Sequence, residues 1–271
     1  MALWHAKFML WRPLNSPGAD SGDKMSKHLQ QILVFFLIMF SAVSIIQADE
    51  YQKNEFSISL PSGWIEMPRD IIDSYEKALS KAAPDFPLQH YDYGFQRISS
   101  KNWFEYPYIL IQVKNTGRIP ENELKKLDQI SVQKDIDVQK EQVKSLMSEI
   151  QTGKMVFDQQ NRIIWMRIEG NVANIGPIAG LTSMIPTEKG IIQVNGYSLK
   201  SEYPEYDPIF RSIALSTAPV PNLLYKAKWS DNVPSAIRGI NWAKVAGKTI
   251  LWGMIGGVIG LMTYRRRKKE K

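Results

Sequence analysis

Two uncharged, apolar segments near the ends of the 271-residue chain constrain most strongly what it can fold into. From Leu29 to Ala48 no residue is charged; Lys24 and Lys27 precede this run and a polar stretch follows it. A basic region, an apolar run and a small residue before a polar stretch are typical of a secretory signal peptide. We predict a signal peptide over residues 25–48, cleaved after Ala48, although a run of about 20 residues is also long enough to remain as an uncleaved anchor.

The second apolar segment lies near the C-terminal end. Residues 249–264 carry no charge, and only Lys248 interrupts a longer span, so we predict a transmembrane helix over residues 245–264. A basic tail follows at residues 265–271, and such tails stay on the cytoplasmic side. The body of the chain is therefore expected outside the cytoplasm whether or not the signal peptide is cleaved. With cleavage the protein is single-pass, and we expect it in the bacterial inner membrane.

Small residues recur along the predicted membrane helix. Thr249, Gly253 and Gly257 are spaced four apart, and so are Gly256 and Gly260. This spacing lets two helix backbones approach closely. We expect the helix to contact membrane lipid and to pair with a protein partner or a second copy of the chain. The alternative is that these glycines only reflect the frequency of glycine in membrane helices.

The first 24 residues do not resemble the start of a signal peptide. Residues 1–24 contain two tryptophans, two prolines and no periodic pattern, whereas Met25 begins an ordinary basic signal region. We expect translation to start at Met25, with residues 1–24 outside the natural protein. A cytosolic tail with its own function is the alternative.

The charge of the chain is unevenly distributed. Residues 49–220 hold 19 basic and 23 acidic side chains, while residues 221–271 hold 11 and 2, so the net charge of +7 belongs to the C-terminal end. A mildly acidic body excludes general nucleic-acid binding. The chain has no cysteine and three histidines, which excludes thiolate chemistry and leaves little material for a histidine-rich metal site. We expect no cofactor and no metal.

Between its ends the chain is predicted to form one α+β domain over residues 49–218, followed by a linker and juxtamembrane segment over residues 219–244. Antiparallel hairpins mixed with three helices indicate an antiparallel sheet covered by helices. The predicted strands are 55–60, 91–98, 106–115, 154–158 with 162–170, and 178–186 with 190–200; the predicted helices are 69–83, 121–150 with a break near 132–138, and 204–216.

Short motifs in this domain resemble the Mog1/PsbP-like fold. "FSISLPSGW" begins at Phe56, and a late strand leads into a helix in which Phe210 precedes Ser212 and Ile213. The resemblance covers residues 53–217 and implies a sandwich of sheet and helices. It also implies a recognition or assembly role and transfers no catalytic residue. The long segment 121–150 and the C-terminal anchor depart from the compact members of this group.

One segment stands out as a candidate binding surface. Trp103, Phe104, Tyr106 and Tyr108 lie within six positions. Packing in a strand core is the common reason for such a density of aromatic residues, but Trp and Tyr are also favoured at binding hot spots. We assign the candidate surface to these four residues, with His90 as a neighbour across the hairpin.

Chemistry-bearing motifs are weak. His90 and Asp92 are two apart on a predicted strand and supply half of a metal site, for which a surface histidine is the plainer explanation. Asp135, Asp137 and Glu141 lack the pattern of a calcium loop. The sequence therefore predicts a non-catalytic, membrane-anchored binding or assembly module. The alternative is a membrane-anchored hydrolase using carboxylate chemistry, which requires a carboxylate of raised pKa in a cleft.

Overall fold

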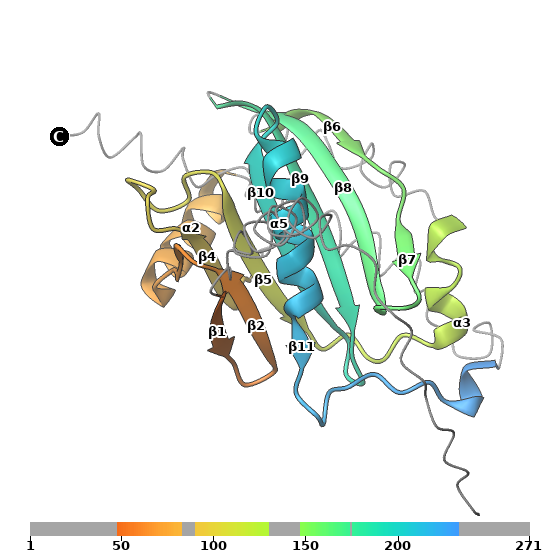
Figure 1. Cartoon of the computed structure of the whole chain (residues 1–271). Coiled ribbons are helices and arrows are strands. Elements are labelled where there is room, and N and C mark those ends of the chain that lie inside the picture. Colours follow the sequence, from red (N-terminus) through yellow and green to blue (C-terminus); the bar gives the residue numbers. More distant parts are fainter. Residues whose placement is uncertain (1–47, 83–89, 130–146, 174, 233–271) are drawn as a thin grey trace, which may run out of the picture. The chain divides into compact units, whose positions relative to one another are not determined.

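A computed structural model describes residues 48–82, 90–129, 147–173 and 175–232 of the chain, and they form an α+β domain (Figure 1). Its helices are α2 (Arg69–Ala82), α3 (Glu121–Leu124) and α5 (Tyr203–Ser216), with short 3-10 turns η1 (Leu127–Gln129) and η2 (Trp229–Asn232). Its strands are β1 (Ala48–Gln52), β2 (Phe56–Pro61), β3 (Trp64–Glu66), β4 (Tyr93–Arg97), β5 (Tyr108–Lys114), β6 (Met147–Thr152), β7 (Val156–Asp158), β8 (Ile163–Val172), β9 (Gly176–Pro186), β10 (Ile191–Leu199) and β11 (Ala218–Pro219).

The strands pair into two antiparallel sheets. The larger sheet has the order β3-β4-β5-β10-β9-β8-β6, with β7 also paired to β8, and the smaller one has the order β1-β2-β11. In the centre of the large sheet, Asn195 of β10 lies opposite Leu110 of β5 on one side and opposite Thr182 of β9 on the other. Strand β5 is apolar along most of its length because both of its faces are buried.

Each face of the large sheet carries its own hydrophobic core. Helix α2 covers one face with Ile72, Tyr75 and Leu79, which recur at helical spacing and pack on side chains such as Leu110 and Tyr197. Strand β2 and helix α5 cover the other face, and Figure 1 shows α5 lying across β8–β10. The side chains of this second cover are Phe56, Ile58 and Leu60 from β2, and Tyr203, Phe210, Ile213 and Ala214 from α5.

Helix α5 lies close to the sheet because β10 contains a glycine beneath it. A Cβ atom at Gly196 would come within 2.4 Å of Cγ of Phe210, far inside van der Waals contact. The Phe210 ring therefore occupies the space that any larger residue at position 196 would need.

The predicted α+β class with an antiparallel sheet is confirmed, as are the helix near 69–83, the helix near 204–216 and the two C-terminal hairpins. One difference is that a second small sheet, rather than helices alone, covers part of the large sheet.

The predicted helix over 121–150 begins at Glu121 as expected, but its length is wrong, and the expected break near 132–138 lies outside the described residues. Helix α3 stops at Leu124, and the described residues resume at Met147 in β6, which pairs with β8. Met147 and Ile150 are both buried although they are three apart, which imitates helical spacing. The cause is a bulge: the register with β8 shifts between Ser148 and Gln151, and Glu149 adopts φ 54°.

The predicted linker also begins too early. Residues 218–232, which we call the strap, pack on the domain: β11 pairs with β2, Leu224 forms a bridge with Thr187, and η2 contacts α3 (Figure 1). Leu223 and Asp231 of the strap are buried. Long-range contacts hold this proline-containing segment, and no local pattern signals them.

None of the helices in the described ranges is long and apolar enough to cross a membrane. The predicted membrane helix over 245–264, with Thr249, Gly253, Gly256, Gly257 and Gly260, lies outside those ranges. So do residues 1–24, the basic tail 265–271, nearly all of the predicted signal peptide, and the acidic residues at 135, 137 and 141.

Candidate functional site

The four predicted surface aromatics divide into two groups. Phe104 and Tyr108 are buried, with 4% and 1% of their surface exposed. They are core residues, so their assignment to the candidate binding surface was wrong. Trp103 and Tyr106 are partly buried and pack against the same core. Tyr108 faces the core beneath α2, because alternate residues of β5 lie on that face of the sheet.

The loop between β4 and β5, residues 98–107, is held by side-chain hydrogen bonds to its backbone, and we call it the aromatic loop. Buried Gln96 donates through Nε2 to the Asn102 carbonyl at 2.9 Å and accepts from the Phe104 N–H at 2.8 Å. The Glu105 carboxylate accepts from the N–H groups of Lys101 and Asn102. These bonds fix the loop without any regular secondary structure.

Phe104 is the most constrained residue of the aromatic loop. Its φ is +61°, which is costly for a bulky side chain, by about 1–3 kcal/mol. Its ring stacks on Tyr75 of α2 with centroids 4.2 Å apart and meets Tyr108 edge-on at 5.6 Å. Tyr106 in turn stacks on Tyr108 at 5.1 Å. The strained backbone is thus held by packing on both sides, with Trp103 immediately before it.

A polar cluster lies at α2 and the start of β4. The Glu76 carboxylate, 7% exposed, accepts from the Tyr91 N–H at 2.6 Å and lies 3.3 Å from Nδ1 of His90. Asp92 accepts from the Val113 N–H at 2.6 Å and lies 3.7 Å from Nε2 of His90. Each carboxylate therefore ties one element to another through a backbone bond, while the His90 side chain is mostly exposed.

Arg69 completes this polar cluster at the first turn of α2. Its guanidinium donates to the Tyr91 carbonyl and forms an ion pair with Asp73 at 2.7 Å. The predicted pairing of His90 with Asp92 is present, but in the described part of the chain no group of three His, Cys, Asp or Glu side chains is arranged to hold a metal ion.

Tyrosines dominate the interior between α2 and the sheet. Tyr75, Tyr91, Tyr108 and Tyr197 are all buried there, and the Tyr108 and Tyr197 rings are 5.4 Å apart. Burial raises the pKa of the Tyr108 and Tyr197 phenols well above the usual value, so both stay neutral at physiological pH.

A buried polar network crosses the centre of the same face. Asn195 Oδ1 accepts from Thr182 Oγ1 and from Gln193 Nε2, both at 2.9 Å, and all three side chains are fully buried. Asn195 Nδ2 also donates to the Leu110 carbonyl of β5, at 3.4 Å. The network joins β5, β10 and β9, so it favours one register among the central strands.

The strap is held by a buried ion pair that the sequence reasoning missed. Arg118 donates from its two terminal nitrogens to the two oxygens of Asp231, at 2.6 Å each, and from Nε to Glu188 at 3.0 Å. The Arg118 guanidinium also lies 4.4 Å from the centroid of the Tyr225 ring, and the Tyr225 hydroxyl donates to the Ile119 carbonyl. Hydrogen bonds from Arg118 hold the pKa of Asp231 well below its usual range.

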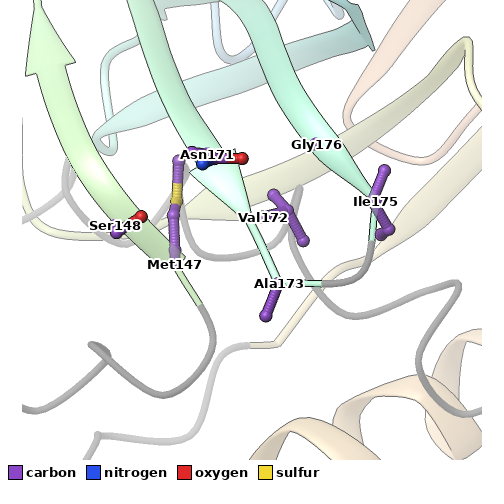
Figure 2. A pocket seen from close by; sticks show the side chains of 7 residues that line it. All are labelled: Met147, Ser148, Asn171, Val172, Ala173, Ile175 and Gly176. Carbon is purple, nitrogen blue, oxygen red and sulfur yellow. The ribbon is translucent and has the colours of Figure 1, made fainter.

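A hollow of about 410 Å³ lies at the end of the sheet where β6 begins and β8 turns into β9 (Figure 2). None of its lining residues belongs to the aromatic loop. Figure 2 shows Met147 and Ser148 on one strand and Asn171 and Val172 on the next, with Ile175 just before the start of β9. The hollow is lined by seven residues: Met147, Ser148, Asn171, Val172, Ala173, Ile175 and Gly176. None of them is titratable, so the walls of the hollow supply no acid or base.

No protein-family model matches the chain, and no curated protein is significantly similar to it. Among solved structures, PsbP (CyanoP) of Synechocystis sp. PCC 6803 has a TM-score of 0.43 and 10% identity, covering 66% of this chain and 95% of that one. LpqN of Mycobacterium tuberculosis, involved in cell envelope biogenesis, has a TM-score of 0.35 and 15% identity, covering 66% and 93%. A protein of unknown function from Pseudomonas aeruginosa, PA94, a putative regulator, has a TM-score of 0.28 and 8% identity, covering 65% and 99%.

The first of these proteins is a PsbP, one of the proteins after which the resembled fold is named. All three TM-scores are low. The architecture of this chain therefore rests on its own strand pairing, and its function is argued from its own residues.

Proposed function

We propose that this protein is a non-catalytic binding or assembly module, held at the outer face of a membrane by the helix predicted over residues 245–264. Its partner is a protein of the same compartment, and the aromatic loop is the surface that recognises it. The glycine-lined helix pairs with a partner in the membrane, as its small-residue spacing favours.

The strained, fixed conformation of the aromatic loop is the observation that carries this proposal. Backbone strain of this kind persists only where surrounding contacts enforce it, and it concentrates at functional sites. Here Gln96 and Tyr75 enforce it at Phe104. A loop held in advance loses little conformational freedom on binding, which favours affinity.

The composition of the aromatic loop suits a protein partner. Ile98 is 65% exposed at its start, and Trp103 and Tyr106 are partly exposed. Trp and Tyr are enriched among the residues that contribute most to protein–protein binding. Ile98 adds exposed apolar surface that a bound partner would remove from water.

Co-purification of the full-length protein from native membranes in mild detergent tests the proposal. The informative variant is Ile98→Asp, which places a charge on the aromatic loop without touching the core. Its matched control is Leu215→Asp, since Leu215 is 49% exposed on α5, which covers the other face of the sheet.

We expect wild type and Leu215→Asp to co-purify with the same partner. Ile98→Asp should recover at least about tenfold less of that partner, because disrupting one hot spot removes about 2 kcal/mol or more of binding free energy. Melting curves of both variants control for folding. Equal recovery by Ile98→Asp and Leu215→Asp would contradict the assigned surface. A wild-type chain that elutes alone and monomeric would contradict the partner itself.

A further inference from the structure

The outward side of the strap has a composition that the binding proposal does not explain. Trp229 is 88% exposed, and Leu224 is 45% exposed. Large aromatic side chains are rarely left in water to this extent without a role. Lys226 lies between them in sequence and is also exposed.

The strap sorts its side chains into two sets. Leu223, Tyr225 and Asp231 face the domain: Leu223 is 7% exposed, Tyr225 bonds to Ile119, and Asp231 bonds to Arg118. The other set faces outward and consists of Leu224, Lys226 and Trp229. Because Arg118 fixes the inward set, the outward set is presented by a rigid segment rather than by a loose linker.

We propose that this outward face docks on an anionic phospholipid bilayer, with Trp229 at the depth of the headgroups and Lys226 at the lipid phosphates. The inference rests on the membrane attachment proposed above. Tryptophan is favoured at membrane–water interfaces, and basic residues next to an anionic surface each add attraction. The inference assigns the face of the domain that turns toward the membrane.

Charge and chain length both support a bilayer as the occupant. From 221 to 248 the sequence holds five basic residues and one acidic residue. Asp231 is already bonded to Arg118, and Lys228 is paired with Glu188 of the domain, so the other four basic residues supply the positive charge of this stretch. Residues 233–244 separate the strap from the predicted span and reach at most about 45 Å when fully extended, at roughly 3.3–3.6 Å per residue. The strap is therefore the described part of the chain nearest in sequence to the lipid.

The absence of cysteine from the chain allows a direct test with the full-length protein. A nitroxide label is attached to Ala227→Cys on the strap or, as a control, to Ser212→Cys on the exposed side of α5; both positions are exposed. The protein is reconstituted into vesicles of phosphatidylcholine with 30 mol% phosphatidylglycerol (about one lipid in three) or of phosphatidylcholine alone. Accessibility to oxygen and to a water-soluble nickel complex then reports the depth of each label.

We expect the Ala227→Cys label to be at least about threefold less accessible to nickel than the Ser212→Cys label in anionic vesicles, and to lose this protection when Trp229→Ser is added or phosphatidylglycerol is left out. Equal accessibility of the two labels would overturn the inference. So would a label shielded from both nickel and oxygen, which indicates a protein occupant.

Flotation after an alkaline wash separates the two proposals. A chain that floats with the vesicles keeps the anchor, and the label alone then decides the docking. A chain that does not float refutes the anchor, and the label read on the same protein mixed with the vesicles still shows whether the strap binds lipid.

Discussion

Breaking the Arg118–Asp231 pair should release the strap without unfolding the rest of the domain. The proposed perturbation is Asp231→Asn, which keeps the shape of the side chain and removes its charge. Both bonds of the pair are 2.6 Å long, and the two side chains are 10% and 2% exposed. Removing one partner of such a buried pair costs about 3–5 kcal/mol.

The lower end of that range applies here because Glu188 remains 3.0 Å from Nε of Arg118. About 3 kcal/mol corresponds to roughly a 150-fold increase in the opening equilibrium of the strap, at about 1.36 kcal/mol per factor of ten. The loss stays local, since the strap can detach and return Arg118 to water while both cores stay intact.

Hydrogen exchange read by mass spectrometry measures this opening in the full-length protein. Peptides from residues 218–232 should exchange about 100-fold faster in Asp231→Asn, and peptides from β9 and β10 should not change. The matched control is Asp73→Asn. The Arg69–Asp73 pair is nearly as short, at 2.7 Å, but its side chains are 44% and 43% exposed, so its loss should cost only about 0.3–0.5 kcal/mol. Strap exchange within about threefold of wild type would refute the reasoning, as would equal acceleration across the whole domain.

Three further predictions concern the sheet. Gly196→Ala should destabilise the domain by about 2 kcal/mol, because its Cβ would meet Phe210 at 2.4 Å, and adding Phe210→Leu should recover part of this loss in a thermal melt. Asn195→Ala should cost about 2–4 kcal/mol in urea unfolding, since Thr182 and the Gln193 amide lose their common buried acceptor; a loss below about 1 kcal/mol would contradict this account. Burial lowers the pKa of Lys114 to about 8, below the value of about 10.4 in an unfolded chain. Between these two values the unfolded chain binds more protons than the folded chain, so the free energy of unfolding should rise with pH from 8 toward 9.5. Lys114→Met should remove that rise, and an unchanged slope in this variant would show that another group causes it.

The elements that the sequence predicted correctly are those with local signals. Helix α2 follows Pro68, carries Asp70 in its first turn and repeats Ile72 and Tyr75 on its buried face. The β9–β10 hairpin combines two apolar runs with a short turn between them. In each case the residues that specify the element lie within it.

The errors occur where distant residues decide. The bulge in β6 gives Met147 and Ile150 a helix-like spacing, and only pairing with β8 reveals a strand. Arg118 and Asp231 are 113 positions apart, so nothing near either residue indicates their bond. A truncation placed at the predicted boundary of 218 would remove Asp231 from its partner, and a chain ending after 232 is the sounder design.

The candidate surface was predictable only in part. The density of aromatic residues locates the loop, but the burial of Phe104 and Tyr108 depends on contacts with α2 and β10. Period-two alternation alone would turn Gln193 toward water, whereas the structure buries it beside Asn195. The outward position of Trp229 likewise follows from how Arg118 holds the strap.

The claim at the centre of this account is that the domain lies outside the cytoplasm on a membrane anchor, and cysteine labelling in intact cells tests it most directly. The cysteine-free chain receives Ser212→Cys on the domain or Lys271→Cys in the tail, and a maleimide that cannot cross the cytoplasmic membrane is added before or after lysis. The account predicts that position 212 reacts in intact cells, that position 271 reacts only after lysis, and that both proteins stay with the membrane through an alkaline wash. Reaction at 271 but not at 212 in intact cells, or release of the protein by the wash, would contradict it.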